Sequence, residues 1–151
     1  MASRGKSTGK GESKDSYAGI PRAVMEHPDF KALTGNAPKA LQVLAYQFRG
    51  HNNGDLTLAE RYMIERWGFK SKGTVERARD QLLERGLILQ TRTGRFTNPG
   101  GQCALYALTW LPINECPNKR LEVAPTNTPA RIFARELADL RNNKTPAPDS
   151  G

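Results

Sequence analysis

The sequence has few of the residues that build disulfide frameworks, metal centres and catalytic sites. Its 151 residues include two cysteines and two histidines. Cys103 and Cys116 belong to no Cys-x-x-Cys pair and have no histidine nearby, whereas zinc sites need several ligands at close spacing. A reduced protein without metal or cofactor is the simplest expectation, with a single disulfide as the alternative. Because no nucleophile with a histidine partner and no complete phosphate-binding loop is recognisable, we also expect that the protein is not an enzyme.

Long hydrophobic runs are also missing from the sequence. No stretch approaches the ~20 consecutive apolar residues that cross a bilayer. Residues 1–16 lack the apolar segment of a signal peptide. These two absences predict a protein of the cytoplasm that has no membrane partner.

Positive charge, by contrast, is plentiful and unevenly placed. The formal net charge is +8. Residues 57–110 carry nine basic against five acidic side chains and residues 1–22 carry five against two, whereas the rest of the chain is nearly balanced. A basic excess focused on one unit favours nucleic acid or another polyanion as the partner. A positive net charge can also serve only to keep a protein soluble. A structural motif is therefore needed before nucleic acid is inferred as the partner.

Sequence patterns divide the chain into four parts. We expect a disordered basic tail over residues 1–19, a folded domain over 20–113, a linker and C-terminal helix over 114–141, and a disordered tail over 142–151. Residues 20–33 fit a short helix interrupted at Pro28, with His27 as a capping or surface residue at the break. Apolar residues at helical spacing place the C-terminal helix between Ala130 and about Leu140.

The folded domain contains three strong helical patterns. The first covers residues 36–50, where apolar side chains recur at helical spacing. The second is expected to begin at Thr57, because Thr57 and Glu60 have the spacing of a capping box. The third covers residues 73–85, with Ser71 as its N-cap.

Strand patterns flank these helices and complete the fold prediction. Residues 87–92 and 103–110 predict a pair of strands joined by a glycine-rich loop, with Phe96 as an anchor at the base of that loop. Leu56 fits a very short strand, and Gly68 ends the second helix before a tight turn. The order predicts an α+β protein with a winged helix-turn-helix, meaning a three-helix core and a β-hairpin wing, extended by an N-terminal and a C-terminal helix.

The third helix has two exposed flanks of opposite character. At ~100° per residue, Val75, Ala78 and Leu82 share the buried direction. The acidic side chains at positions 76, 80 and 84 gather on one outer flank, where phosphates would repel them. Polar and basic side chains gather on the other flank, namely Lys70, Thr74, Arg77 and Gln81. An ordinary solvated helix face is the alternative explanation of this pattern.

The basic flank predicts how helix 73–85 would read DNA. The major groove admits a helix, and Arg and Gln can each grip a base edge with two hydrogen bonds. The residues expected to contact DNA are Arg77 with Gln81 or Thr74 at bases, Lys70, Ser71 and Lys72 at phosphates, and Arg92 and Arg95 of the wing at an adjacent minor groove or the backbone. A plain solvent loop is the alternative for the wing, and the basic tail fits either a leader or an arm in the minor groove.

Short motifs spread through the chain carry a resemblance to known proteins. They are residues 21–24 (PRAV), 30–33 (FKAL), 52–58 (NNGDLTL), 73–78 (GTVERA), 82–88 (LLERGLI), 108–110 (LTW) and 128–133 (TPARIF). This run resembles the small winged helix-turn-helix DNA-binding proteins encoded on bacterial phages, plasmids and other mobile elements. The resemblance implies a bacterial, nucleoid-associated protein with a regulatory or a replication role, and it identifies no contact residues.

Three functions fit these observations. The first is a sequence-specific double-stranded-DNA-binding protein, a transcriptional regulator of a mobile element that reads the major groove with helix 73–85. The second is a replication-initiation protein that binds origin repeats, and the third is a winged-helix module for protein interaction or RNA binding. The expected partners are double-stranded DNA, a second copy of the chain through the C-terminal helix, and a replication or transcription protein.

Overall fold

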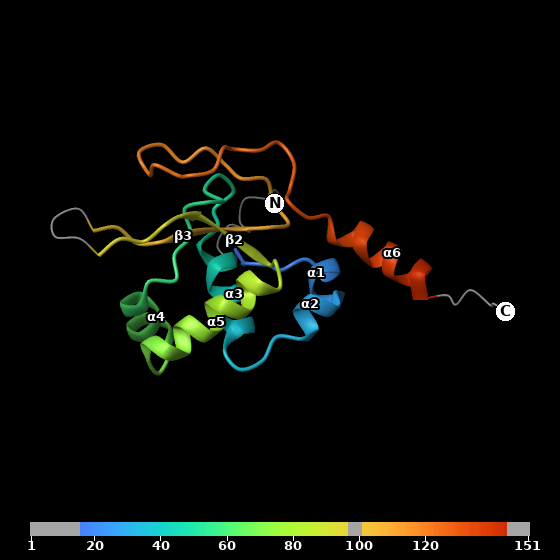
Figure 1. Ribbon diagram of the computed structural model, residues 1–151, viewed down its shortest axis with the longest axis horizontal. Coiled ribbons are helices and arrows are strands. Elements are labelled where there is room, and N and C mark those ends of the chain that lie inside the picture. The colour runs from blue at the N-terminus through green and yellow to red at the C-terminus, as the bar shows by residue number, and fades with distance from the viewer. Residues whose placement is uncertain (1–15, 97–100, 145–151) are drawn as a thin grey trace, which may run out of the picture.

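The computed structural model describes residues 16–96 and 101–144, and the fold belongs to the α+β class. Within these ranges the elements are α1 (Arg22–Glu26), α2 (Pro28–Lys31), α3 (Ala37–Gln47), α4 (Glu60–Trp67), α5 (Lys72–Glu84), β2 (Ile88–Arg92), β3 (Leu105–Leu108) and α6 (Phe133–Lys144). Figure 1 shows α3, α4 and α5 gathered beneath the sheet, with the hairpin and α6 projecting in opposite directions. No helix in the described part of the chain is long and apolar enough to span a membrane.

The hydrophobic core lies between α3, α5 and the sheet. α3 buries the apolar stripe that predicted it, and Leu41 and Leu44 are fully enclosed. α5 contributes Val75 and Leu82 from its predicted inward face. Asn36 occupies the N-cap of α3, but its side chain makes no capping hydrogen bond. α3 ends at Gln47, three residues before the predicted end at residue 50.

The predicted capping box of the second helix is wrong. α4 begins at Glu60, with Ala59 at the N-cap and no side-chain cap. The cause lies in α3, because the Gln47 side chain donates to the Thr57 carbonyl at 2.9 Å and accepts from the Thr57 N–H at 2.8 Å. Both backbone groups of Thr57 are thus used outside the helix, and its hydroxyl accepts from the Ala59 N–H instead.

The sheet is an antiparallel hairpin with an extra bridge at its inner side. β2 pairs with β3 from Ile88 opposite Leu108, with a bulge between Gln90 and Arg92. Leu56 forms an isolated bridge with Tyr106, so the predicted very short strand is present only as one bridging residue. β3 is shorter than the predicted strand 103–110. Beyond it a second isolated bridge joins Arg95 to Gln102 and carries the hairpin outward.

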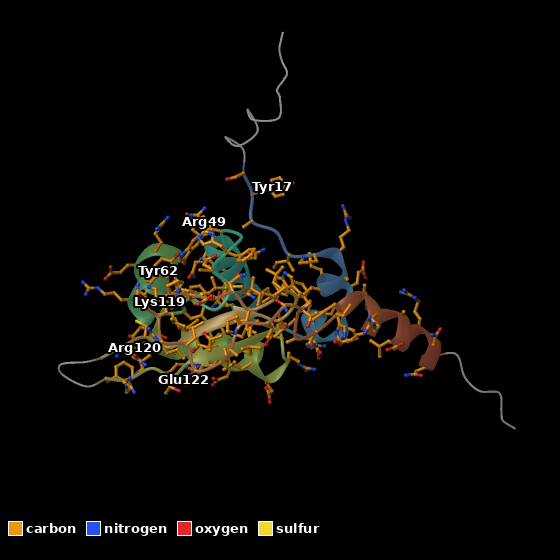
Figure 2. All side chains as sticks on the ribbon, turned by 90° about the horizontal axis from the view of Figure 1, so that it is seen from above. Tyr17, Arg49, Tyr62, Lys119, Arg120 and Glu122 are labelled. Carbon is orange, nitrogen blue, oxygen red and sulfur yellow. The ribbon has the colours of Figure 1, made fainter. Side chains whose placement is uncertain are left out.

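Residues 109–131 return along the hairpin and are fixed by hydrogen bonds. The Glu122 N–H donates to the Thr91 carbonyl at 2.7 Å, on the edge of β2 that does not face β3. At the base of the hairpin the fully buried Asn53 donates to the carbonyls of Leu108, Leu111 and Pro112 and accepts from the Leu108 N–H. In Figure 2, Lys119, Arg120 and Glu122 of this segment lie on the side of the molecule from which the hairpin projects.

α6 is held at its start by an ionic network around Arg131. Arg131 donates to Asp29 at 2.9 Å and to Glu136 at 3.0 Å through Nε, and its guanidinium lies 4.2 Å from the centre of the Phe133 ring. Arg131 also donates to the carbonyls of Arg85 and Gly86 at the end of α5, at 2.8 and 3.1 Å.

His27 completes this network. The ring is buried, accepts the Asp29 N–H at Nδ1 as the cap of α2, and lies 3.0 Å from Glu136 at Nε2. The predicted capping role of His27 is therefore confirmed. The burial of His27 against α6 could not be predicted from the pattern of apolar residues around it.

The predicted bounds of the C-terminal helix are wrong at both ends. α6 begins at Phe133, and before it the Arg131 N–H donates to the Thr109 carbonyl at 2.9 Å. The helix then continues to Lys144, although residues 142–151 were predicted to be disordered. The disorder predicted for residues 1–15 and 145–151 lies outside the described residues, and residues 16–19 are exposed without regular structure.

Candidate functional site

α4 and α5 are joined by a tight turn whose geometry is fixed locally. Gly68 has a φ of +77° and ends α4, with its N–H directed at the carbonyls of Ile64 and Met63. Phe69 is buried and ties the turn to the core. The Ser71 hydroxyl accepts the Thr74 N–H at 3.2 Å and so caps α5, as predicted from the sequence. α4 and α5 are thus two helices joined by a short, glycine-containing turn.

The first turns of α5 present cations to solvent. Lys70, Lys72 and Arg77 are all exposed. The absence of a side chain at Gly73 gives the Arg77 guanidinium room, because its Nη1 lies 3.2 Å from the place a Cβ would occupy. The N–H groups at a helix start and a positive helix dipole favour anions there. The start of α5 therefore offers a site for an anionic partner.

The acidic flank of α5 is partly neutralised by cations of the same helix. Glu76 lies 3.9 Å from Lys72, and Asp80 lies 2.9 Å from Arg79. Arg79 is not among the residues predicted from the sequence to contact DNA. It also interacts with Tyr106, whose pKa is raised by burial and held back by the Arg79 charge. The carboxylates of Glu76 and Asp80 are thus each paired with a cation of the same helix.

Two of the predicted contact residues are used inside the protein. The Gln81 amide accepts from the Thr34 N–H at 2.9 Å and donates to the Thr34 carbonyl at 3.2 Å, joining α5 to the turn before α3. The Arg92 guanidinium donates to the carbonyls of Cys103 and Lys119. Both side chains thus have structural partners. Arg95 differs, since its backbone pairs with Gln102 while its side chain is exposed.

Two cations that the sequence analysis did not select lie beside the turn. Lys39 of α3 lies over the Phe69 ring at 5.5 Å. Arg66 of α4 stacks on Trp67 at 5.8 Å and donates to the Tyr46 hydroxyl at 3.3 Å. Lys39 is 30 residues from Phe69 in the chain, so helical spacing carried no signal for this proximity. We call Lys39, Arg66, Lys70, Lys72 and Arg77 the basic surface.

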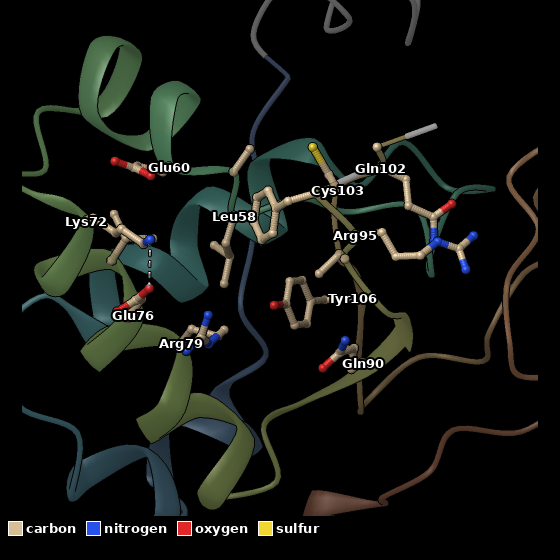
Figure 3. A pocket seen from close by; sticks show the side chains of 16 residues that line it. Leu58, Glu60, Lys72, Glu76, Arg79, Gln90, Arg95, Gln102, Cys103 and Tyr106 are labelled. Carbon is tan, nitrogen blue, oxygen red and sulfur yellow. Dashed lines mark ion pairs between the residues drawn. The ribbon is translucent and has the colours of Figure 1, made fainter. Parts of the chain in front are cut away.

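A cleft of about 670 Å³ separates α5 from the hairpin. Its lining includes Leu58, Val75 and Tyr106, which are all buried core residues. Lys72 and Arg79 line it from α5, and Arg95 lines it from the hairpin. In Figure 3, Tyr106 points across the cleft toward Arg79, while Lys72 faces Glu76. The cleft thus places the basic start of α5 opposite the outer part of the hairpin.

No family model, curated protein or solved structure matches the chain. Among residues 16–96 and 101–144, no group of three or more His, Cys, Asp or Glu side chains is placed to hold a metal ion. Function is therefore inferred from the geometry and the charge of the chain itself.

Proposed function

We propose that this protein binds double-stranded DNA through a winged helix-turn-helix, with α5 in the major groove and the hairpin as the wing. The observation that carries the proposal is the exposed, cationic start of α5, placed by a tight turn directly after α4. α5 contributes Lys72 and Arg77 there, and Lys70 lies in the turn. A helix presented in this way fits the width of the major groove.

The order of elements supports this proposal. The Leu56 bridge, α4, the turn, α5 and the β2–β3 hairpin follow one another as in a winged helix. The hairpin lies across the cleft from the first turns of α5. A DNA strand between a major groove that holds α5 and a minor groove that faces the hairpin would then pass along this cleft. Lys72 and Arg95 on its two sides would contact phosphates of that strand.

Arg77 is the residue that we assign to base recognition. Its guanidinium is exposed and can form two hydrogen bonds to a guanine edge. Gln81 is a weaker candidate than the sequence suggested, because a base contact would break its two hydrogen bonds to Thr34. Thr74 shares the capping hydroxyl of Ser71 at 3.1 Å, which keeps it near the helix start.

A salt titration on duplex DNA tests the proposal. The full chain is titrated onto a fluorescent 30-base-pair duplex of mixed sequence, and anisotropy gives the affinity from about 50 to 300 mM salt. Arg77 is assigned to a base, so counterion release by the other four cations of the basic surface and by Arg95 predicts a slope of log affinity against log salt of roughly −4 to −5. No duplex binding at about 50 mM salt would overturn the proposal in favour of a protein-interaction module. Tighter binding to single-stranded or duplex RNA would overturn it in favour of RNA.

The variant Arg77→Ala tests the assigned contact. We expect an affinity loss of ~1–3 kcal/mol on a duplex selected from a random pool, and a broader set of selected sequences. Arg22→Ala, which removes an exposed cation at the start of α1, is the matched control and should leave the affinity nearly unchanged. Equal losses in the two variants would remove Arg77 from base recognition.

The same selection separates a regulator from a replication protein. A palindromic selected site favours a dimeric transcriptional regulator of a mobile element, because the symmetry of a dimer is mirrored in its site. Tandem direct repeats favour replication initiation at an origin. We place the regulator first.

A further inference from the structure

Phe96 is the most unusual apolar side chain on the surface. Its ring is 99% exposed, more than any other large hydrophobic side chain in the described ranges. The prediction that it anchors the base of the loop is therefore wrong. A scattered exposed apolar residue is ordinary on a protein surface. Phe96 differs because it lies in the outer part of the hairpin and directly follows the exposed cation Arg95.

The chain leading to Phe96 is held mainly by hydrogen bonds. We define the hairpin stem as residues 92–95 and 102–105. Arg95 and Gln102 exchange two backbone hydrogen bonds of 2.8 Å, and the Gln102 amide donates to the Thr93 carbonyl. Glu122 accepts from the N–H and the hydroxyl of Thr93, at 3.0 and 2.9 Å. The stem is thus braced up to the residue that precedes Phe96.

Charge would bring this part of the hairpin to DNA. Arg95 is exposed and directly precedes Phe96, and it shares the cleft with Lys72 of α5. Phe96 lines the same cleft as Arg95. A cation and a hydrocarbon ring side by side on the outer hairpin allow simultaneous contact with a phosphate and with the bases of a groove.

We propose that Phe96 inserts as a wedge between base pairs in the minor groove beside the α5 site, and so kinks the duplex. The proposal rests on the proposed DNA-binding function and names the contact that the wing makes. Proteins that bend DNA through the minor groove use apolar side chains in this way, placed between base steps with Arg or Lys nearby. The wedge would act at flexible pyrimidine–purine steps, where unstacking is easiest.

Phe96 and Arg95 provide a matched pair for the first test, by anisotropy on the selected duplex. Phe96→Ala should weaken binding roughly tenfold without changing the salt slope, because the ring carries no charge. Arg95→Ala should reduce the magnitude of the slope by about one. Phe96→Leu retains an apolar wedge and should restore most of the affinity. An unchanged affinity in Phe96→Ala would overturn the insertion.

A force-extension measurement tests the kink itself. A tethered duplex of several kilobases is stretched with and without protein, at concentrations that give equal occupancy in the anisotropy assay. The wild-type chain should lower the apparent persistence length below the ~50 nm of bare duplex. Phe96→Ala should leave it near the bare value, and Phe96→Leu should lower it again.

Each outcome of these measurements separates the two proposals. The wedge is overturned, and DNA binding is left intact, if the wild-type chain binds without lowering the apparent persistence length. The same holds if Phe96→Ala lowers the persistence length as much as the wild-type chain does. Absence of duplex binding in the anisotropy assay overturns both proposals together.

Discussion

The hairpin stem and α6 both project from the core, in opposite directions, and they are attached by different chemistry (Figure 1). The stem is braced by hydrogen bonds between polar side chains and backbone groups, through Arg92, Gln102 and Glu122. α6 is attached through the Arg131 ionic network and by Phe133, which is buried in the core. Leu105 at the inner end of the stem is buried, but the outer part of the stem has no comparable apolar contact, since Phe96 at its end is exposed.

This difference indicates which part can adapt to a partner. Hydrogen bonds near solvent each contribute modestly to stability, because water competes for the same groups. A part held only in this way opens at lower free energy than one packed on the core. We therefore expect the stem to adjust on binding and the start of α6 to remain docked until the domain unfolds.

The largest effect is expected from removing Arg131. Its side chain is 20% exposed and connects α2, the end of α5 and α6. Arg131→Ala should lower the free energy of unfolding by ~2–3 kcal/mol, because Asp29, Glu136 and two carbonyls lose a charged donor. Urea denaturation measures the loss. The control Arg135→Ala, at an exposed position of α6, should change it by less than ~0.5 kcal/mol. Equal effects would refute the central role of Arg131.

A smaller effect is expected from loosening the stem at Arg92. Arg92→Ala removes the hydrogen bonds to the Cys103 and Lys119 carbonyls and should cost about 1 kcal/mol of stability. Hydrogen exchange should accelerate at the amides of Arg95 and Gln102 while the core amides stay protected. Uniform acceleration across the whole domain would show that the stem is not an independently opening unit.

Acid should weaken the attachment of α6 by a smaller amount. Hydrogen bonding to Arg131 lowers the pKa of Glu136 below its ordinary value of 4.5, with further help from the neighbouring His27. The carboxylate thus contributes stability that is present above pH 4.5 and is lost as the pH falls through the folded-state value. Glu136→Gln should flatten that part of the pH dependence, by less than ~1 kcal/mol. Asp139→Asn, at an exposed position of the same helix, should leave the curve unchanged.

The smallest effect is expected at Glu122. Hydrogen bonds from the Thr93 N–H and hydroxyl lower the pKa of this exposed carboxylate. Glu122→Gln keeps one acceptor oxygen in place of two and so can retain one of these bonds; because the site is exposed, the thermal midpoint should not move measurably. Hydrogen exchange at the Thr93 amide should nevertheless become faster, because a neutral acceptor binds it more weakly. An unchanged exchange rate would mean that the carboxylate charge does not brace the stem.

Features that depend on neighbouring residues could be predicted from the sequence. Ser71 caps α5 and Gly68 adopts the left-handed conformation, as their positions indicated. The buried stripe of Val75, Ala78 and Leu82 is also confirmed. Capping and helical periodicity act within a few residues, so the pattern and the structure agree.

Features that depend on distant partners could not be predicted in the same way. The acceptors and donors of Gln81 lie 47 residues away in the chain, and one acceptor of Arg92 lies 27 residues away. The Gln47 side chain, ten residues from Thr57, displaces the start of α4. Tertiary hydrogen bonds of this kind override local spacing, and a single sequence gives no signal for them.

The carbonyls of Arg85 and Gly86, at the end of α5, determine where the chain can be cut to make a folded fragment. They are bound by Arg131, some 45 residues downstream, so the end of the helix that we assign to DNA is finished by the C-terminal region. A fragment cut at residue 113 would lose this partner together with Phe133, and we expect it to aggregate or to fray at α5. The shortest fragment suitable for binding work therefore extends through residue 136 or beyond.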